Sequence, residues 1–378
     1  MKETLEKLSV RGFKSIRELD DFRVENLNVF VGANGAGKSN LIELFRMLLA
    51  IMENNFDQYI LAYNGADGFL FSGPKVTTSI HAQFVFKYHD DYAEHPYRYS
   101  FDATPTNDGR KFRLSQESTS ITNQPPSYDP HAEDSLLRDE RGGRYKYQDR
   151  KKGGDLVNEV ISNWMIYHFH DTSANAPMRR YEIVEDCHRL RSDASNIAPF
   201  LRKMKNDPDL SSYYREIKNS VRLVIPFFDD FRLDAHKLGE ATKVALSWQQ
   251  KGSDFPMQPY HLSDGSIRFI CLATALLQPS PPSMIIIDEP ELGLHPEAIG
   301  ILGELIQDAA KRTQVVIATQ SPLLLDQFAI EDIIVVNRRD GQSTFERLER
   351  GNYDQWLKDY SVGQLWTKNV IQGGTTNE

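Results

Sequence analysis

A glycine-rich run that ends in Lys38 and Ser39 has the residue types needed to bind phosphate groups. Residues 32–39 read Gly-Ala-Asn-Gly-Ala-Gly-Lys-Ser, which fits the pattern G-x-x-x-x-G-K-[ST]. Glycines let backbone N–H groups approach phosphate oxygens closely because no Cβ stands in the way. Lys38 can place a cation on the β- and γ-phosphate oxygens, and the Ser39 hydroxyl can bind Mg²⁺. The run predicts a nucleoside triphosphate site, with binding residues Gly32, Asn34, Gly35, Ala36, Gly37, Lys38, Ser39 and Asn40.

Two adjacent carboxylates follow a short apolar run later in the chain. Residues 284–287 are expected to form a buried parallel strand that ends at Asp288 and Glu289. In a nucleotide-binding sheet, phosphate chemistry takes place at the carboxyl ends of the strands. Asp288 is therefore expected to hold Mg²⁺, directly or through water, and Glu289 to orient and deprotonate the attacking water. A solvated acidic turn is the alternative.

A third stretch, Leu-Ser-Asp-Gly-Ser at residues 262–266, precedes an apolar run with helical spacing. Ser263, Asp264 and Gly265 would lie at the N-terminus of that helix, where N–H groups and the helix dipole favour an anion. One nucleotide does not need two such helix ends on one chain. We therefore expect two chains, with the turn of one closing on the γ-phosphate held by the other. A simple helix cap is the alternative.

Strands and helices that could position these residues alternate along the chain. A β-rich run at 29–31 leads into the phosphate-binding run, and a helix with one apolar face follows from Lys38. The last third alternates strands with helices, which indicates a parallel α/β sheet. Expected strand pairs lie at 76–90 with 95–104 and at 231–238 with 242–250; expected helices at 266–278 and 299–312; further strands at 313–322 and 332–339.

Changes in composition divide the chain into five expected segments. Residues 1–100 and 261–345 carry the motifs above. Residues 101–157 are polar, contain Gly and Pro and hold few aliphatic residues, which predicts a flexible insertion. Residues 158–260 are expected to hold a core strand, a helical arm at 180–225 and a strand pair, and residues 346–378 a C-terminal tail.

Bulk composition is typical of a soluble globular protein, with 40% hydrophobic and 26% charged residues. No apolar run reaches the roughly 18 residues that indicate a membrane span, so no membrane association is expected. Cys187 and Cys271 lack motif spacing and are expected to be reduced thiols in a cytoplasmic protein. The net charge of −9 means that the surface as a whole is not suited to nucleic acid.

One basic stretch lies within the predicted insertion. Between residues 138 and 152, arginines and lysines are interleaved with Tyr145 and Tyr147, a composition that could meet the phosphates and stack on the bases of DNA or RNA. A solvated loop is the alternative, because Asp and Glu residues are interspersed. The candidate nucleic-acid contacts are Arg141, Arg144, Lys146, Arg150, Lys151 and Lys152.

The motifs, taken in order, resemble those of ABC-type ATPases. GANGAGKS, LSDGS, MIIIDEPELGLHP and ATQSP occur in that order, and RGFKSI near the start fits the RecF, Rad50 and SMC branch. More closely, the chain resembles stand-alone bacterial ATPases of the AAA_21 type, relatives of the ATPase half of OLD proteins; YHFHDTS and RLRSDASNIAPFLRKM fit that likeness. The resemblance implies an α/β P-loop NTPase fold, with an ABC-ATPase head of mixed β lobe and parallel-sheet core and a helical arm. It also implies ATP and Mg²⁺ as cofactors and a head-to-tail ATP-sandwich homodimer.

The resemblance also suggests roles for single residues. Ser263 and Gly265 would contact the γ-phosphate bound by the other chain, whereas Asp264 departs from the glycine usual in transporters and could cap the helix. His295 falls in the D-loop position, either at the dimer seam or as a satisfied loop histidine. Gln320 stands where many ABC ATPases keep a histidine; it can donate a hydrogen bond but cannot carry charge, which implies slow turnover.

Other positions keep two interpretations each. Lys14 in RGFKSI is a candidate to reach the nucleotide phosphates or the ribose. His170 and Asp171 are candidates to touch the metal or the attacking water. His168 and His170 have strand spacing that could ligate a metal, but no third ligand is evident. Gln83 lies in a predicted strand and is expected to be structural, so no glutamine loop is identified.

The resemblance implies an ATPase that couples its nucleotide state to nucleic-acid binding or to a separate effector, a nuclease or a toxin, in DNA maintenance or anti-phage defence. No acidic D-x-D cluster follows residue 322, so any nuclease is expected on another polypeptide. Two alternatives stay open. One is a regulatory scaffold locked by ATP with little turnover, and the other is the nucleotide-binding subunit of a transporter.

Overall fold

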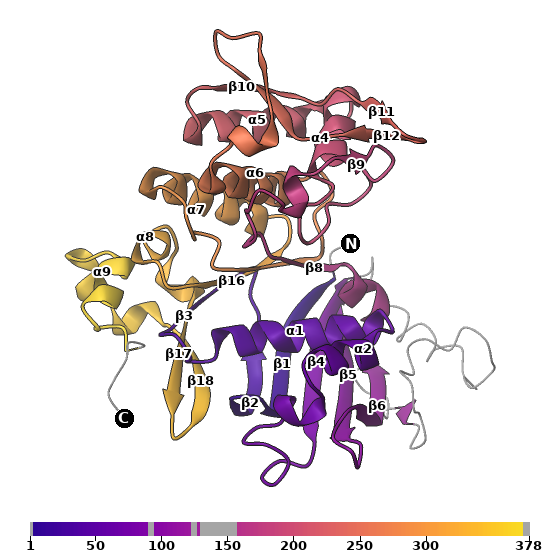
Figure 1. Ribbon diagram of the computed structural model, residues 1–378. Helices are drawn as coiled ribbons and strands as arrows, with labels where there is room; N and C mark the ends of the chain where they lie inside the picture. The colour runs from indigo at the N-terminus through magenta and orange to yellow at the C-terminus, as the bar shows by residue number, and fades with distance from the viewer. Residues whose placement is uncertain (1–2, 90–93, 122–126, 129–156, 373–378) are drawn as a thin grey trace. The chain divides into compact units, whose positions relative to one another are not determined.

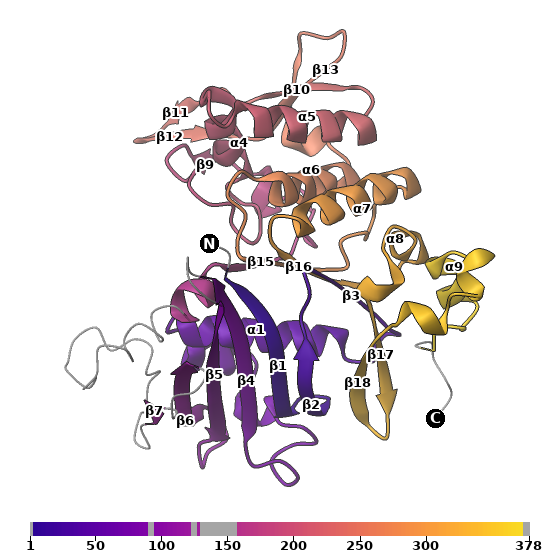
Figure 2. The same ribbon diagram turned by 180° about the vertical axis from the view of Figure 1, so that it is seen from behind.

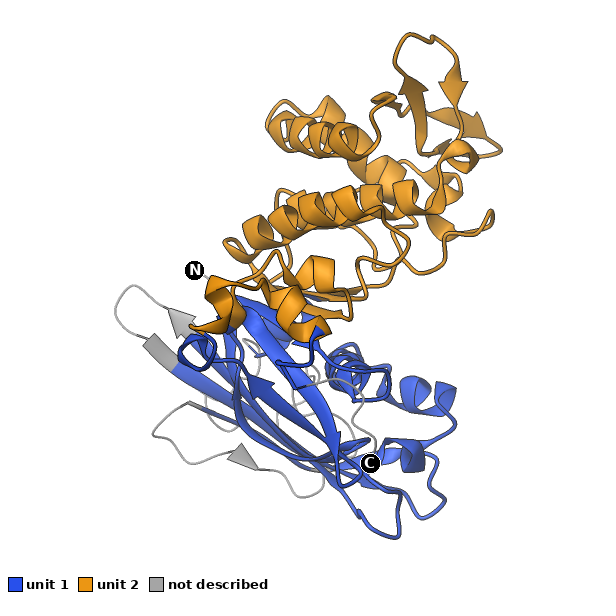
Figure 3. Cartoon of the chain, turned by 90° about the vertical axis from the view of Figure 1, so that its left-hand side faces the viewer, with its two compact units in different colours: residues 1–164, 331–353, 368–378 blue, residues 165–330, 354–367 orange. Residues whose placement is uncertain are grey.

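The computed structural model describes residues 3–89, 94–121, 127–128 and 157–372 (Figure 1). The chain forms two compact units (Figure 3). Unit 1 comprises residues 1–164, 331–353 and 368–378, and unit 2 comprises residues 165–330 and 354–367. In the part of the chain that is described, no helix is long and apolar enough to cross a membrane.

Unit 1 contains an antiparallel sheet of β1 (Thr4–Phe13), β2 (Ile16–Arg23), β4 (Ile80–His89), β5 (Glu94–Pro105), β6 (Phe112–Ile121) and β7 (Ser127–Tyr128). The strands lie in the order β2-β1-β4-β5-β6-β7. Alternate residues such as Phe84 and Phe86 are buried, the pattern of a sheet with one covered face. Helices α1 (Lys38–Met52) and α2 (Phe56–Ala62) cross one face of this sheet (Figures 1 and 2), where the rings of Phe45 and Phe86 both contact Trp164.

A second group of strands in unit 1 leads into the phosphate-binding run. β3 (Leu27–Val31) lies parallel to β17 (Ile333–Arg339), and β17 pairs antiparallel with β18 (Gln342–Arg347). Every residue of β3 is buried, as expected for a parallel strand covered on both faces. α1 starts directly after the loop that leaves β3, which confirms the predicted strand–loop–helix order. Residues 331–353 return to unit 1, a grouping that composition does not reveal.

The core of unit 2 is built on parallel strands and helices. β15 (Met284–Asp288) pairs in parallel with β16 (Gln314–Thr319), and β8 (Trp164–Tyr167), which begins at the unit boundary, lies on the other side of β15. Helices α5 (Ser211–Val224), α6 (Asp264–Leu277) and α7 (Pro296–Ala310) pack side by side (Figures 1 and 2). α8 (Pro322–Leu325) follows β16 and packs on α9 (Val362–Thr367). The predicted α/β class with parallel pairing is confirmed.

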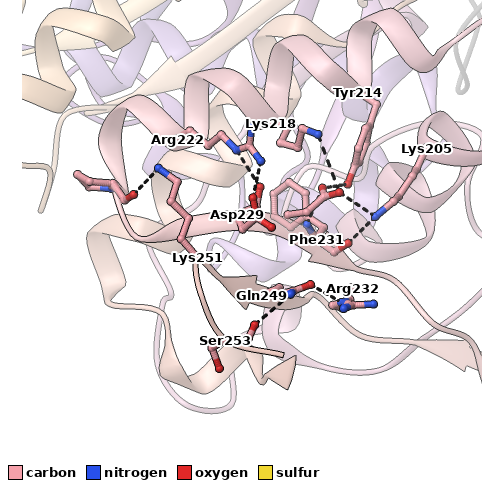
Figure 4. Close-up of polar contacts among 12 residues, drawn as sticks. Lys205, Tyr214, Lys218, Arg222, Asp229, Phe231, Arg232, Gln249, Lys251 and Ser253 are labelled. Carbon is pink, nitrogen blue, oxygen red and sulfur yellow. Dashed lines mark hydrogen bonds and ion pairs between the residues drawn. The ribbon is translucent and has the colours of Figure 1, made fainter. Parts of the chain in front are cut away.

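A helical arm with two small antiparallel sheets completes unit 2. Its elements are α4 (Ile197–Asn206), α5, β9 (Glu182–Ile183), β10 (Phe228–Arg232), β11 (His236–Leu238), β12 (Ala241–Val244), β13 (Ser247–Gln250) and β14 (Pro256–Met257). The sheets have the orders β10-β13-β14 and β11-β12-β9. Figure 4 shows how cationic side chains tie the helices to β10: Lys205 Nζ donates to Phe231 O at 2.6 Å, and Arg222 pairs with Asp229 at 2.6 Å.

Two sequence predictions differ from the structure. The flexible insertion was placed at 101–157, but β5 continues to Pro105 and β6 follows, because only one face of this sheet needs apolar residues. Phe101, Phe112 and Leu114 supply them within a polar composition. Residues 180–196, expected to be helical, form β9 and turns, and the first helix of the arm starts at Ile197. The proposed nucleic-acid contacts lie outside the described residues: Arg141, Arg144, Lys146, Arg150, Lys151 and Lys152.

Asp230 is the carboxylate on which polar contacts of the arm converge. It accepts a hydrogen bond from Tyr214 Oη at 2.6 Å and pairs with Lys205 at 3.3 Å and Lys218 at 3.9 Å. Burial raises the pKa of this carboxyl, but the Tyr214 hydrogen bond and the two lysines outweigh burial and hold the pKa below its ordinary value. The folded-state pKa therefore lies below the unfolded value of about 3.9. The resulting stabilisation is present above about pH 4 and is lost as the pH falls through the folded-state pKa.

We expect Asp230→Asn to lower the free energy of unfolding by about 1–3 kcal/mol at neutral pH, because an amide cannot satisfy both lysines. The difference from the wild type should shrink once the pH falls below about 4. Urea unfolding at several pH values measures both effects. Asp234→Asn removes the same charge at an exposed position of the arm and serves as the control, with an expected change within about 0.5 kcal/mol. Equal losses in the two variants would contradict the role given to Asp230.

Candidate functional site

The glycines of residues 32–37 are required by close packing within unit 1. A Cβ on Gly32 would overlap Val336 O of β17. Gly37 has a φ of +115°, and a Cβ there would overlap Ser343 Oγ and lie 2.8 Å from Ser15 Oγ. Gly35 also has a positive φ of +81°, but no atom lies within 4 Å of its Cβ position. The run is therefore held against the β17–β18 hairpin on one side, while Gly35 remains exposed.

Hydroxyl groups far apart in sequence hold this loop from behind. Asn40 Nδ2 donates to Ser15 Oγ at 2.6 Å, Ser15 and Ser343 share a 2.6 Å hydrogen bond, and Ser343 Oγ donates to Ala36 O at 2.5 Å. Arg338 Nη1 donates to Gly35 O at 3.3 Å. Sequence reasoning missed Ser15, Ser343 and Arg338. The only local signal was the RGFKSI motif, whose Ser15 accepts the hydrogen bond from Asn40.

Lys38 and the start of α1 make a cationic end to the loop. Lys38 is 6% exposed, and its Nζ donates to Gly32 O at 2.6 Å and to Ala33 O at 3.1 Å. α1 begins after Gly37 with no side-chain cap hydrogen bond and no acidic residue in its first turn. Positive charge from the lysine and from the helix N-terminus is thus not opposed by a carboxylate of this turn. Ser39 is exposed at the same end of the helix.

Lys14 lies on the aromatic side of unit 1. Its Nζ stands 4.8 Å from the centre of the Phe69 ring and 5.4 Å from that of Tyr63. Burial lowers the pKa of Lys14, and the charge of Glu43 acts against that shift. In this conformation the ammonium is engaged in cation–π contacts. A role for Lys14 at the phosphates or ribose stays a prediction that needs the side chain to leave these rings.

In unit 2 the predicted base and the predicted switch glutamine lie together. Asp288 is the last residue of β15, and Glu289 follows it with a φ of +45°, in the left-handed region. Glu289 N donates to Ala318 O at 2.8 Å, which fixes this unusual backbone at the end of the strand pair. Gln320 Nε2 donates to Glu289 Oε1 at 2.8 Å. The two side chains meet because β15 and β16 are parallel neighbours and end side by side.

A further carboxylate, Glu291, stands behind this pair and was not singled out from the sequence. Its Oε1 accepts the Thr319 hydroxyl at 2.6 Å and the Gln320 N–H at 3.2 Å. Burial raises the pKa of Glu291, and the nearby charge of Glu289 adds to the rise. In the sequence, Glu291 is visible as the third acidic residue of Asp-Glu-Pro-Glu. Its role could not be predicted from that motif, because its hydrogen-bond partners lie at or just after the end of another strand, β16.

The Ser263–Gly265 turn is a capped and closely packed helix start. Ser263 is the N-cap of α6, and its Oγ accepts the Ser266 N–H at 3.1 Å. Asp264, which the sequence suggested as the cap, instead pairs with Arg179 at 3.1 Å, because Ser263 occupies the extended N-cap position. A Cβ on Gly265 would overlap Gly293 O, so this glycine is also needed for close packing.

Arg268 of α6 ties this helix start to two loops. Its Nε donates to Phe169 O at 2.9 Å and its Nη2 to His170 O at 3.1 Å, while Nη1 donates to Leu292 O. Arg268 is 6% exposed, and burial lowers the pKa of its guanidinium. The loop after β8, the start of α6 and the segment before α7 are thus one connected backbone framework.

The predicted histidine sites have ordinary structural contacts. His295 is the N-cap of α7, its Nδ1 accepting the Glu297 N–H at 3.4 Å, and its side chain is exposed. His170 and Asp171 are exposed, and Asp171 accepts the Ser173 N–H at 3.0 Å. Across the described ranges there is no group of three or more His, Cys, Asp or Glu residues that could hold a metal ion. Gln83 lies within β4.

Comparison with known proteins identifies a family and a curated relative. A family model described as "AAA_21: AAA domain, putative AbiEii toxin, Type IV TA system" matches residues 27–326. The "Retron Vc95 probable ATPase" of Vibrio cholerae serotype O1 biovar El Tor is 21% identical over 389 residues, covering 89% of this chain and 74% of that protein.

Two solved SMC head structures share the fold. The SMC head bound to the C-winged helix domain of ScpA matches with a TM-score of 0.60 and 18% identity over 93% of this chain and 99% of that one. The head with an extended coiled coil bound to the C-terminal domain of ScpA, derived from Pyrococcus furiosus, gives 0.58 and 16% over 94% and 99%. The fold is therefore similar to that of SMC head domains.

Gly37 and Gly35 form a matched pair for testing the packing of the loop. Both need a positive φ, so alanine at either position should cost about 1–2 kcal/mol of unfolding free energy. Gly37→Ala should cost at least about 1 kcal/mol more, because its methyl group would displace the hydrogen-bonded Ser15 and Ser343 hydroxyls. Urea unfolding measures the difference. If Gly35→Ala is as destabilising as Gly37→Ala, the close packing behind the loop does not matter.

Proposed function

The chain belongs to the AAA_21 family, and we propose that it binds ATP at residues 32–40 and hydrolyses it to ADP and phosphate with Glu289 as the base. The observation that carries this proposal is the cationic end of the phosphate loop. A buried lysine is folded onto the carbonyls of Gly32 and Ala33, at a helix start that has no side-chain cap hydrogen bond and no acidic residue in its first turn. Phosphate oxygens are the ligands that such a helix start and lysine attract.

The proposed reaction uses the phosphate loop and the carboxylate of Glu289. Backbone N–H groups of the loop and Lys38 bind the β- and γ-phosphates. Glu289 orients a water molecule and takes its proton as the water oxygen attacks the γ-phosphorus. The bond from the γ-phosphorus to the β–γ bridging oxygen breaks, and its electrons remain on ADP. Gln320 holds the Glu289 carboxylate through the 2.8 Å hydrogen bond, which supports its role as the residue that aims the base.

The donor set fits magnesium. The Ser39 hydroxyl and the Asp288 carboxylate are hard oxygen donors of the kind that Mg²⁺ prefers. Bound magnesium would neutralise charge on the β- and γ-phosphate oxygens.

We further infer a head-to-tail ATP-sandwich dimer. The start of α6 is a second helix N-terminus whose Ser263 is exposed, as a surface that meets another chain's phosphate requires. Asp264 would repel that phosphate, but its ion pair with Arg179 offsets the negative charge. In the dimer, Ser263 and Gly265 contact the γ-phosphate held by the partner, and His295 lies near the seam. The SMC head fold supports this arrangement.

The output is proposed to be control of a separate effector, a nuclease or a toxin, in DNA maintenance or anti-phage defence. The family model's description names a putative toxin system, and the Vibrio cholerae relative is named as the ATPase of a retron, which supports this direction. An ATP-locked scaffold with slow turnover is the second candidate. It is favoured by Gln320, which cannot exchange a proton with the reacting groups.

Replacing Lys38 tests nucleotide binding. We expect Lys38→Ala to weaken ATP binding by about 100-fold, because a charge-assisted contact to phosphate is lost. Titration calorimetry with ATP and Mg²⁺ measures the affinity. Lys311→Ala removes an exposed lysine of α7's C-terminal end and should leave affinity unchanged. Unchanged affinity in Lys38→Ala would remove the assignment of the phosphate loop.

Replacing Glu289 separates binding from chemistry. We expect Glu289→Gln to bind ATP normally but to hydrolyse it about 10²–10⁴-fold more slowly, since the amide cannot accept the proton. Phosphate release gives the rate, and sedimentation should detect an ATP-dependent dimer that accumulates in this variant. Adding Ser263→Arg should prevent that dimer. Near-normal steady-state hydrolysis by Glu289→Gln would exclude the base assignment.

A further inference from the structure

Glu291 is a carboxylate behind the Glu289–Gln320 pair that the proposed function leaves without a role. Near Glu291, the segments that follow β15 and β16 no longer pair through backbone hydrogen bonds. The last ladder pair of β15 and β16 is Asp288 with Ala318, and one more backbone hydrogen bond joins Glu289 N to Ala318 O. Beyond it, residues 289–291 and 319–321 are joined through side chains.

The side chain of Glu291 makes that connection. Its Oε1 accepts two donors of the other segment, the Thr319 hydroxyl at 2.6 Å and the Gln320 N–H at 3.2 Å. The Thr319 hydroxyl oxygen also accepts the Ser321 N–H at 3.0 Å. One carboxyl oxygen therefore fixes the backbone of the turn that carries Gln320.

The other oxygen of Glu291 has a different environment. Oε2 is buried and has no hydrogen-bond partner within the described part of the chain. A charged carboxylate would be costly there, with Glu289 nearby and one oxygen unsolvated. A carboxyl group protonated on Oε2 avoids that charge, and its Oε1 can still act as a carbonyl acceptor for the two donors.

We propose that Glu291 is a positioning residue for ATP hydrolysis: it holds the Thr319–Ser321 turn so that the Gln320 amide meets the Glu289 carboxylate. This inference rests on the proposed function, because Glu289 must be the base. Glu291 touches neither nucleotide nor water in this role. It acts through Gln320, and it needs a hydrogen-bond acceptor at Oε1 rather than a negative charge.

The acceptor requirement predicts opposite results for two substitutions. Glu291→Ala removes the acceptor and should lower kcat by about 10–100-fold, while the KM and Kd for ATP change less than about twofold, because the phosphate loop is untouched. Glu291→Gln keeps an acceptor oxygen and a donor in the place of the protonated oxygen, and should recover kcat to within about threefold of the wild type. Glu304→Ala, at an exposed position of α7, is the control.

Two substitutions of Thr319 test the same contact while Glu291 itself is unchanged. Thr319→Val removes the hydroxyl donor and should lower kcat by about threefold to tenfold without raising the KM, whereas Thr319→Ser keeps the donor and should stay close to the wild type. This pair answers the question even if Glu291→Ala does not fold. Thermal unfolding of each variant shows whether a lower kcat comes from loss of the fold or from a misplaced Gln320 in a folded protein.

A double-mutant cycle distinguishes this inference from failure of the proposed function. In a Glu289→Gln background, Glu291→Ala should lower the residual rate by less than about twofold, because there is no base left to aim. Equal losses in Glu291→Ala and Glu291→Gln, or wild-type kcat in Glu291→Ala, overturn the positioning role. Normal hydrolysis in Glu289→Gln or in Lys38→Ala instead overturns the proposed function itself.

Discussion

Parallel pairing of β15 with β16 is the constraint on which the proposed catalytic residues of unit 2 depend. In a parallel pair both strands end at the same edge, so residues that are about thirty positions apart in sequence leave the sheet as neighbours. Asp288 faces Ala318 in the ladder. Glu289, one residue after Asp288, and Gln320, two residues after Ala318, bond through their side chains. At this edge of the sheet the chain turns sharply, because Glu289 has a left-handed backbone conformation.

Close glycine packing and side-chain hydrogen bonds to backbone carbonyls hold the rest of the proposed machinery. Gly32 and Gly37 allow the phosphate loop to lie directly on the β17–β18 hairpin, and Gly265 allows α6 to approach the carbonyl of Gly293. Arg268 then joins carbonyl groups of two separate loops to α6. Arginine suits this task because its planar fork offers several donors in fixed directions. The start of α6 is therefore linked directly to the segment before α7.

The main elements of the site could be predicted from the sequence because their signals are local. The phosphate loop lies between β3 and α1, and the acidic pair ends a fully apolar strand, so pattern and spacing sufficed for their order and secondary structure. The supporting contacts were not accessible in this way. Ser15 bonds to Ser343, 328 positions away, and no periodicity links them. Asp264 was expected to be a cap, but a partner 85 positions away, Arg179, binds it instead. Polar composition also concealed β6, because a strand with one covered face needs few apolar residues.

In the proposed dimer, the N-cap of α6 has a consequence for how tightly the two chains can hold one another. Ser263 Oγ accepts the Ser266 amide and also donates to the Ser266 hydroxyl at 2.8 Å. A hydroxyl can keep the first bond while its proton rotates from one acceptor to another. An incoming anion would therefore replace only the Ser266 hydroxyl, and the helix would stay capped throughout. One neutral hydrogen bond is exchanged for one to a charged group, so the gain in binding free energy at this contact is modest. The contact between the two chains can therefore break again without unwinding the helix.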